Sequence, residues 1–577
     1  MLAGNDLKAV RFADEDARRR LGPVLSQWAS GPVAGEVSLV KHNIARTVYR
    51  CQGDGGVLYF KHFHSPTPLH RLQRRLGLSD AVCEMRFSEH LSRMAVPAPK
   101  VLAAFCRNGS EWLVSEAVEP SMPADAWHAE RLHSGDRAAI RSATIALAEL
   151  IGRMHASGVI HRDLHCANLL VRTDSPRQLV LMDLHRMRRR RGLSRRSRAA
   201  NLAQLLNDRL LWTQRSERLR FLRHYLRASR ATGSLRGWVR MIEPIADRLR
   251  RRLYAQRERR IFATGQYFAR LSVAGYRGHV VLASKRHVPG SEASGATFSL
   301  EQWRAVLADP EALFVGADVE VIKDSPSSYV VRRRLKIGPN EIEEYIKRPR
   351  RKRAIRWLTD LCRHSRPLRA FRLGHALLAR HIHTALPLAA MEKRRGRFLT
   401  DSILITEAVD SGLHLNKFLN RHLGEGRESN GLQGRHRKRL GQHVLWELGR
   451  LLRRLHQAGF AHRDLKATNL LVRWDGSPGR SPQIIMVDLD GLRQVRRVSA
   501  RQEFRGLMRL NVSLLECPAV SHAGRLRMLL GYLRRPGVGR INFKPYWRLL
   551  QQWSDRKIRR QIASRQRRQK AQRRARP

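Results

Sequence analysis

Residues 148–184 read AELIGRMHASGVIHRDLHCANLLVRTDSPRQLVLMDL, and the chain contains a second copy of this stretch. Residues 447–489 read ELGRLLRRLHQAGFAHRDLKATNLLVRWDGSPGRSPQIIMVDL. The copies lie 301 residues apart at His161 and His462. Similarity at a fixed spacing indicates a repeated domain. We therefore predict two domains of common ancestry, each about 250 residues long.

The residues around the repeated stretch indicate the same order of elements in both copies. Strand-like stretches such as VLYFKHF (57–63) come first. The helical spacing of apolar residues over 143–158 predicts a helix that stops at Gly158. The apolar runs 169–172 and 179–184 are separated by Asp, Ser and Pro, which predicts two strands joined by a turn. The predicted fold class is α+β, with a small β-rich lobe followed by a larger helical lobe in each domain.

The two copies divide the chain into four predicted segments. These are a first domain at 1–255, a connector with some strand at 256–300, a second domain at 301–555 and a basic tail at 556–577. The tail is expected to form a solvated, frayed helix because its charges are nearly all positive.

Composition restricts the partners and the compartment. The chain carries 111 Lys and Arg against 49 Asp and Glu, a formal charge of +62, which suits an anionic membrane face or an acidic glycolipid. An arginine-rich proteome would produce the same charge without any site. No nucleic-acid-reading motif accompanies the charge, so no specific nucleic acid is predicted. Six cysteines without a C-x-x-C pair exclude a disulfide framework and a zinc site.

The sequence offers no apolar core of signal-peptide length near its start and no apolar run of about 18 residues. We therefore expect a cytoplasmic protein. Peripheral contact with the inner face of the cell membrane is a further expectation from the basic charge.

A set of polar residues recurs in both copies. Each contains H-x-D-L-x-x-x-N and then an apolar strand that ends in Asp-Leu. A loop aspartate can accept the proton of an attacking hydroxyl group, while an asparagine and a second aspartate can hold Mg²⁺ through oxygen atoms. Because so many positions match twice, the set predicts phosphoryl transfer from ATP. The candidate catalytic residues are Asp163 and Asp464, and the candidate metal ligands are Asn168, Asp183, Asn469 and Asp488.

The pattern H-x-x-G-x-x-HRDL-x-x-x-N resembles the protein-kinase-like superfamily. The segment MDLHRMRRR at 182–190 is similar to the lipopolysaccharide kinase family, which contains the Kdo and inner-core heptose kinases. The resemblance covers about 35–255 and 315–550. It implies two tandem bilobal protein-kinase-like domains, ATP with Mg²⁺, and phosphorylation of a sugar hydroxyl on a lipid-linked core oligosaccharide.

The resemblance also implies cofactor-binding residues outside the repeated loop. Lys61 and Lys347 match the strand lysine that binds phosphates, and Glu84 matches the helix glutamate that pairs with this lysine. Glu116 and Glu407 fall where a hinge would meet adenine through backbone groups.

Both copies depart from the kinase pattern. Neither has a G-x-G-x-x-G loop, and the aspartate that ends the strand is followed by Leu-His or Leu-Asp without a glycine hinge. The second copy has Lys466 at a phosphate-binding position where the first has His165. However, Ala370 stands where Glu84 aligns, so we expect Lys347 to lack its partner and the first copy to be the better catalyst.

Three functions stay open on the residues alone. The favoured one is an ATP-dependent kinase for a hydroxyl acceptor, either a sugar of the lipopolysaccharide core or a related glycolipid. Lys466 favours a Ser/Thr protein kinase, although an Ala-Pro-Glu signature is not evident. The missing glycine loop and Ala370 favour a tandem pseudokinase scaffold.

Overall fold

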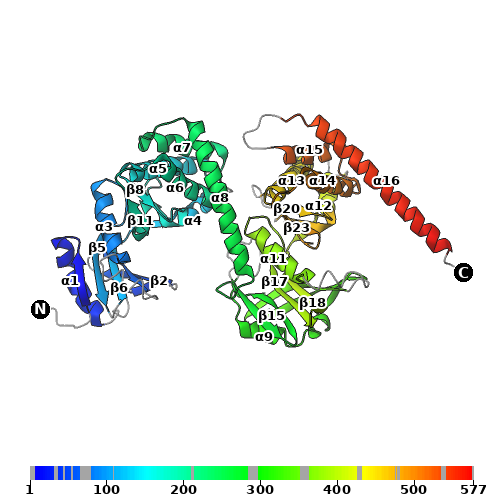
Figure 1. Ribbon diagram of the computed structural model, residues 1–577, viewed down its shortest axis with the longest axis horizontal. Coiled ribbons are helices and arrows are strands. Elements are labelled where there is room, and N and C mark those ends of the chain that lie inside the picture. The colour runs from blue at the N-terminus through cyan, green and yellow to red at the C-terminus, as the bar shows by residue number, and fades with distance from the viewer. Residues whose placement is uncertain are drawn as a thin grey trace. The chain divides into compact units, whose positions relative to one another are not determined.

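The computed structural model divides the chain into two compact units, Met1–Arg252 and Leu253–Pro577. Each unit mixes helices and strands, which confirms the α+β class in this coarse sense (Figure 1). The structure describes residues 7–30, 37–42, 46–53, 56–64, 79–107, 110–209, 213–283, 296–350, 363–424, 432–474, 476, 481–534 and 541–574.

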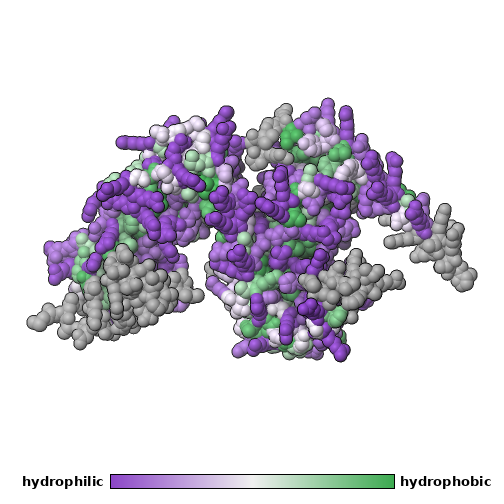
Figure 2. All heavy atoms as spheres, in the orientation of Figure 1, coloured by the Kyte–Doolittle hydropathy of each residue, from purple (hydrophilic) through white to green (hydrophobic). Residues whose placement is uncertain are grey.

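Charged and polar side chains dominate the face of the molecule seen in Figure 2, as a charged fraction of 28% leads one to expect. Within the described ranges, no helix combines the length and the apolar character needed to cross a membrane.

The first unit begins with an antiparallel sheet. Its strands are β1 (Leu7–Phe12), β2 (Val37–His42), β3 (Arg46–Gly53), β4 (Gly56–Phe63), β5 (Val101–Arg107) and β6 (Ser110–Glu116). They lie in the order β1-β5-β6-β4-β3-β2. Since side chains alternate along a strand, the sheet buries both faces. Leu21 of α1 (Glu15–Ser30) packs with Phe60 on one face, and Met85 of α3 (Asp80–Arg93) packs with Leu113 on the other.

Helices and short strand pairs follow this sheet. They are β7 (Ser121–Pro123), α4 (Ala124–Ser134), α5 (Arg137–Ala156), β8 (Val159–His161), β9 (Leu169–Arg172), β10 (Leu179–Leu181), β11 (Met187–Arg189), α6 (Arg195–Arg209), α7 (Arg215–Ala228) and α8 (Leu235–Ile261). The residues of α8 after Arg252 belong to the second unit. The predicted helix end is confirmed, because α5 stops at Ala156 and Gly158 has a φ of 78°. The predicted strand pair is confirmed as β9 and β10.

The second unit has a seven-stranded sheet. Its strands are β12 (Phe268–Val273), β13 (Tyr276–Val281), β14 (Glu320–Ser325), β15 (Ser328–Ile337), β16 (Asn340–Pro349), β17 (Pro387–Arg395) and β18 (Phe398–Glu407). Their order is β12-β13-β17-β18-β16-β15-β14. The helices α9 (Leu300–Val306) and α11 (Arg366–Leu378) contribute buried side chains to the same core as the sheet.

The segment predicted as a connector, 256–300, contributes two strands to this sheet, because β13 pairs with β17. Ala269 and Leu271 alternate with exposed residues and bury their side chains, so these strands belong to the core of the second unit. Residues 284–295 of the same segment lie outside the described residues.

The second unit then repeats the helical order of the first. Its elements are β19 (Gly412–His414), α12 (Leu415–Leu423), α13 (Leu432–Gln457), β20 (Phe460–His462), β21 (Leu470–Arg473), β22 (Gln483–Met486), β23 (Leu492–Gln494), α14 (Ala500–Leu515), α15 (His522–Leu533) and α16 (Lys544–Arg574). The predicted tail is the continuation of α16, as far as the structure describes it.

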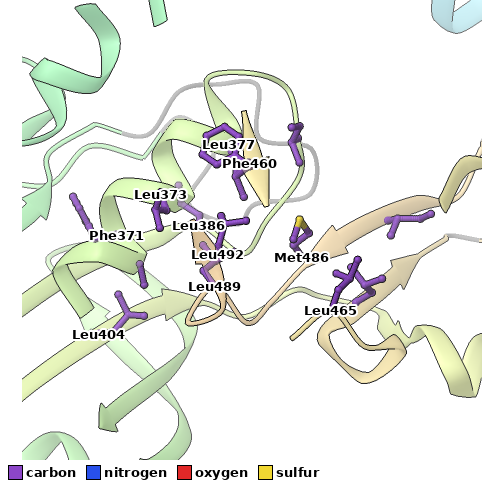
Figure 3. Close-up of a cluster of buried hydrophobic side chains, with 14 of the residues drawn as sticks. Phe371, Leu373, Leu377, Leu386, Leu404, Phe460, Leu465, Met486, Leu489 and Leu492 are labelled. Atoms are coloured by element: carbon purple, nitrogen blue, oxygen red, sulfur yellow. The ribbon is translucent and has the colours of Figure 1, made fainter. Parts of the chain in front are cut away.

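One apolar core joins the sheet and the helical part of the second unit. Figure 3 shows Phe371 of α11 on the side of Leu404 of β18, and Leu377 of α11 beside Phe460 of β20. Leu465, which follows Asp464, and Leu489, which follows Asp488, belong to the same cluster. Because the loop residues are anchored in this core, the polar side chains between them are held in place.

Candidate active site

A buried histidine fixes the loop of the first unit. The backbone N–H of Asp163 donates to Nδ1 of His161 at 3.1 Å, and Nε2 of His161 donates to the carbonyl oxygen of Met182 at 2.9 Å. An amide can only donate and a carbonyl can only accept, so the ring is neutral with its proton on Nε2. Burial lowers the pKa of His161, in agreement with the neutral ring. His161 therefore braces the loop, while the side chain of Asp163 is 53% exposed.

The strand pair β9–β10 brings the two candidate metal ligands together. Leu169 lies opposite Leu181, and the N–H of Met182 donates to the carbonyl oxygen of Asn168 at 2.9 Å. The side-chain amide of Asn168 donates to the backbone oxygen of Asp163 at 2.9 Å, which leaves its carbonyl oxygen as the atom suited to a metal. Asp183 has a φ of 56°, a left-handed conformation that is rare outside glycine.

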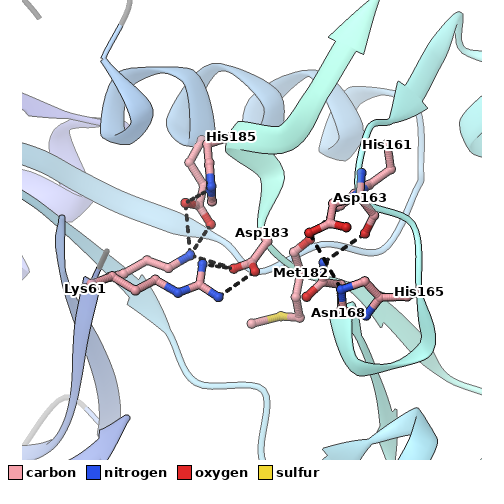
Figure 4. Close-up of polar contacts among 10 residues, drawn as sticks. Lys61, His161, Asp163, His165, Asn168, Met182, Asp183 and His185 are labelled. Atoms are coloured by element: carbon pink, nitrogen blue, oxygen red, sulfur yellow. Dashed lines mark hydrogen bonds and ion pairs between the residues drawn. The ribbon is translucent and has the colours of Figure 1, made fainter. Parts of the chain in front are cut away.

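Lys61 reaches from the sheet to this strand end. Its Nζ lies 2.8 Å from Oε1 of Glu84 on α3 and 3.1 Å from Oδ1 of Asp183. Burial alone would raise the pKa of Glu84, but the charge of Lys61 and a hydrogen bond from His185 lower it to about 2. Figure 4 shows Asp183 between Lys61 and the loop that carries Asp163 and Asn168. The structure thus brings together the residues predicted on the sheet, on the helix and in the loop.

Arg46, at the start of β3, was not among the predicted residues. Its Nη1 lies 2.5 Å from Oδ1 of Asp183 and its Nη2 lies 2.6 Å from Oδ2, a bidentate pair. Burial would raise the pKa of Asp183, but the charges of Lys61 and Arg46 hold it far below its ordinary value. Arg46 occupies the place of the absent glycine-rich loop, and that position was the signal in the sequence that could have identified it.

The second unit builds the same loop. The N–H of Asp464 donates to Nδ1 of His462 at 3.1 Å, and Nε2 of His462 donates to the carbonyl oxygen of Asp488 at 2.8 Å. The amide of Asn469 donates to the backbone oxygen of Asp464 at 2.9 Å, as in the first unit. Burial lowers the pKa of His462 as well. Asp464, Asn469 and Asp488 are therefore brought together.

The expectation that Lys347 lacks a partner is wrong. Ala370 does stand on α11 without a carboxylate, but Nζ of Lys347 lies 2.7 Å from Oδ2 of Asp490 and 3.5 Å from Oδ1 of Asp488. Burial would lower the pKa of Lys347, yet these two aspartates raise it. Asp490 follows the candidate metal ligand Asp488 by two residues and supplies the charge that Glu84 supplies in the first unit.

The residue two positions after each loop aspartate differs between the units. Nζ of Lys466 lies 3.1 Å from Oδ2 of Asp464, whereas Nε2 of His165 lies 3.7 Å from Oδ2 of Asp163. The neighbouring His165 lowers the pKa of Asp163, so this carboxylate is ionised at neutral pH.

The two candidate hinge glutamates have different surroundings. Glu116 ends β6 and pairs with Arg20 of α1 at 3.0 Å, while Glu407 ends β18 and is buried. The backbone N–H of Glu116 donates to Lys100 and that of Glu407 donates to Leu386. Those two N–H groups are therefore engaged, and the adenine contact stays a prediction.

Oxygen donors fit Mg²⁺ at both strand ends. Asn168 with Asp183, and Asn469 with Asp488, offer the hard oxygen ligands that this ion takes. Among the described residues, Glu84, Asp183 and His185 also place one ligand atom each within 4.8 Å of one another. Nζ of Lys61 lies 2.8 Å from Oε1 of Glu84 and 3.1 Å from Oδ1 of Asp183 and balances their charge. We therefore interpret these three residues as part of an ion-pair network with Lys61.

A model of the Lipopolysaccharide kinase (Kdo/WaaP) family matches residues 40–225 and 352–532. The two matched segments confirm the repeat, and each contains one HRD loop with its asparagine and strand-end aspartate. The second segment begins after Lys347, so the assignment of that lysine depends on its contacts with Asp488 and Asp490.

Individual proteins of this kind are similar to parts of the chain. Lipopolysaccharide core heptose(I) kinase WaaP of Pseudomonas aeruginosa is 38% identical over 93 residues, which are 15% of this chain and 35% of that relative. A solved structure, WaaP in complex with acyl carrier protein, is 23% identical and covers 43% of this chain and 99% of that chain, with a TM-score of 0.33.

Proposed function

Because the chain belongs to the lipopolysaccharide kinase (Kdo/WaaP) family, we propose that it is a phosphotransferase. It moves the γ-phosphoryl group of ATP to a hydroxyl acceptor, either a sugar of the lipopolysaccharide core or a related glycolipid. The observation that carries the proposal is the 3.1 Å contact of Lys61 with Asp183, which ties a sheet cation to the strand end beside the HRD loop.

In this proposal the loop aspartates act as general bases toward the acceptor hydroxyl. Asp163 and Asp464 orient the acceptor hydroxyl and accept its proton as the new P–O bond forms. Their side chains are 53% and 58% exposed, so an acceptor can approach them. Lys466 adds a positive charge beside Asp464 for the transferring phosphoryl group.

Residues at the strand ends and on the sheet bind the nucleotide in this proposal. Asn168, Asp183, Asn469 and Asp488 are the proposed ligands of Mg²⁺, which supplies positive charge at the phosphates when bound. Lys61 and Lys347 bind phosphate oxygens and are oriented by Glu84 and Asp490 respectively. Backbone groups at Glu116 and Glu407 border the adenine.

The proposed organisation is two bilobal kinase-like domains, at 1–255 and 301–555, and the strands β12 and β13 from the segment 256–300 complete the sheet of the second. In each, the sheet is the small lobe and the helices after it are the large lobe. The mixed architecture of each unit supports this division, as does the presence of one matched family segment in each.

The acceptor is proposed to be anionic. A formal charge of +62 attracts acidic glycolipid or the inner face of a membrane, by about 1 kcal/mol for each basic residue near such a surface. A cytoplasmic protein that touches this face peripherally would meet a lipid-linked acceptor there.

A Ser/Thr protein kinase is the second candidate. Lys466, which lies 3.1 Å from Asp464, favours it, because a lysine two positions after the loop aspartate is typical of Ser/Thr kinases. The tandem pseudokinase scaffold is the third candidate, and the same experiment separates all three.

The test is transfer of labelled phosphate from ATP by the full chain, with lipid-linked core oligosaccharide and serine-containing protein offered together. Label should enter the sugar. Asp163→Ala should remove the phosphate transfer catalysed by the first unit, and Asp464→Ala that catalysed by the second. In the double variant the rate of transfer should fall about 100-fold or more. Asp174→Ala, at an exposed ion pair with Arg172, is the matched control. Labelling of protein alone would favour the second candidate, and labelling of neither acceptor would favour the third. Unchanged transfer in the double variant would rule out the proposed role of both aspartates.

A further inference from the structure

The hairpin of β2 and β3 stands where a kinase would place its glycine-rich loop, and it contains no glycine between Val37 and Gln52. Without glycine, backbone N–H groups approach phosphates less closely. Something else must then hold the nucleotide phosphates, so the side chains of this hairpin are the place to look.

Three residues form a row across the sheet. Lys41 of β2 lies opposite Val48 of β3, and Val48 lies opposite Lys61 of β4. Directly opposed residues project to the same face. A register shift between Leu39 and Lys41 brings Lys41 into this row, since the residue would otherwise point to the face covered by α1. Arg46, two residues before Val48, projects to the same side.

We propose that Lys41 and Arg46 join Lys61 as a three-cation clamp for the β- and γ-phosphates of ATP in the first unit. The proposal rests on the kinase function proposed above. The clamp replaces backbone contacts by charge-assisted hydrogen bonds from side chains.

The charges around Lys41 support an anionic ligand. Lys41 has no ion-pair partner in the described parts of the chain, whereas Arg46 and Lys61 share the carboxylate of Asp183. Lys41 is exposed, so a ligand can reach it, and partial desolvation by the atoms around it, followed by the nearby charge of Arg46, lowers its pKa. A cation in such surroundings gains most from a further negative charge, which a triphosphate supplies.

Arg46 must also change partner during the reaction. It uses both oxygens of Asp183, which are the atoms that a metal ion would take. When Asp183 binds a metal, Arg46 is released, and phosphate oxygens are the bidentate acceptors that suit a guanidinium group. Arg46 and a divalent ion therefore compete for Asp183 in the absence of nucleotide.

The second unit contains a natural comparison. Lys323 lies opposite Val330, and Val330 lies opposite Lys347, with a register shift between Val321 and Lys323. The row and its bulge are thus repeated. However, Ser328 stands at the position of Arg46, so the second unit has a clamp of two cations.

The test is nucleotide binding by calorimetry, with AMP, ADP and ATP each in Mg²⁺. The full chain carries Lys347→Ala throughout, so that the first unit is observed. Lys41→Ala and Arg46→Ala should each weaken ATP binding by about tenfold or more, the loss expected for one charge-assisted hydrogen bond, and should leave AMP binding unchanged. Arg46→Lys should keep part of the affinity. Arg18→Ala, an exposed change on α1 at the opposite face, is the control and should alter neither.

Unchanged AMP binding shows that each variant is folded. Equal losses for AMP and ATP, no loss for either, or no nucleotide binding by the Lys347→Ala chain would overturn the clamp. Phosphate-dependent losses in a chain that transfers no phosphate would keep the clamp and reject the kinase function. Mn²⁺ binding without nucleotide gives a second readout, because Arg46→Ala should bind Mn²⁺ more tightly. Equal Mn²⁺ affinity would refute the competition for Asp183.

Discussion

Replacing Glu344 by leucine should stabilise the second unit. Glu344 on β16 lies opposite Glu407 on β18, is fully buried, and neither of its carboxylate oxygens has a hydrogen-bond partner among the described residues. Burial, and then the charge of Glu407, raise the pKa of Glu344 well above its ordinary value of 4.5. In the first unit the same position is Leu58, opposite Glu116. The substitution therefore installs a residue that the other copy already accommodates.

An unsatisfied buried polar group costs about 1–3 kcal/mol, so Glu344→Leu should raise the free energy of unfolding by about that amount. The native state keeps a proton that the unfolded chain releases above pH 4.5. The wild type therefore loses stability as the pH rises from 4.5 toward the native pKa, and the gain from leucine should grow with pH.

Urea unfolding followed by circular dichroism at mildly acidic and mildly alkaline pH measures this gain. Glu341→Leu, an exposed change on the same strand, is the control and should shift stability by no more than about 0.5 kcal/mol. A loss of stability in Glu344→Leu at both pH values, or a gain that shrinks as the pH rises, would refute the reasoning.

Three further substitutions test other contacts. Glu84→Gln breaks a buried ion pair and should lower the free energy of unfolding by about 3 kcal/mol at neutral pH. Because the pKa of Glu84 is about 2, this difference should disappear as the pH falls from 4.5 through 2, which acid unfolding measures. A difference that persists at low pH would contradict the prediction. Asp490→Asn should weaken ATP binding by the second unit about tenfold, measured by calorimetry in a Lys61→Ala chain, because Lys347 loses its nearest partner; unchanged affinity would exclude that role. Gly449→Ala would place a methyl group 2.0 Å from a backbone oxygen of α15. Thermal unfolding should therefore show a loss of stability of more than about 3 kcal/mol. A small loss would show that α13 can shift away from α15.

The repeated loop could be predicted from sequence because local geometry decides it. A helix stop at Gly158, two short strands and a polar loop between them place Asn168 beside Met182 and therefore near Asp183. The same local geometry operates in the second copy. Long-range contacts were not needed to predict the loop itself.

Contacts between distant strands and loops were harder to predict. Arg46 and Asp183 are 137 residues apart, and their pairing depends on how the first hairpin folds over the strand end. Asp490 was overlooked because the expected partner of Lys347 was sought on a helix, whereas charge complementarity can be met from a loop. The strands at 268–281 resembled a connector because their partner, β17, lies more than 100 residues later.

The most direct test of the account is a crystal structure of the full chain with a non-hydrolysable ATP analogue and Mn²⁺, located by its anomalous signal. We predict Mn²⁺ about 2.1 Å from oxygen atoms of Asp183 and Asn168, and of Asp488 and Asn469 in the second unit. The analogue's phosphates should lie on Lys61 and Lys347. Manganese held elsewhere in both units, or nucleotide bound away from these strand ends, would contradict the account.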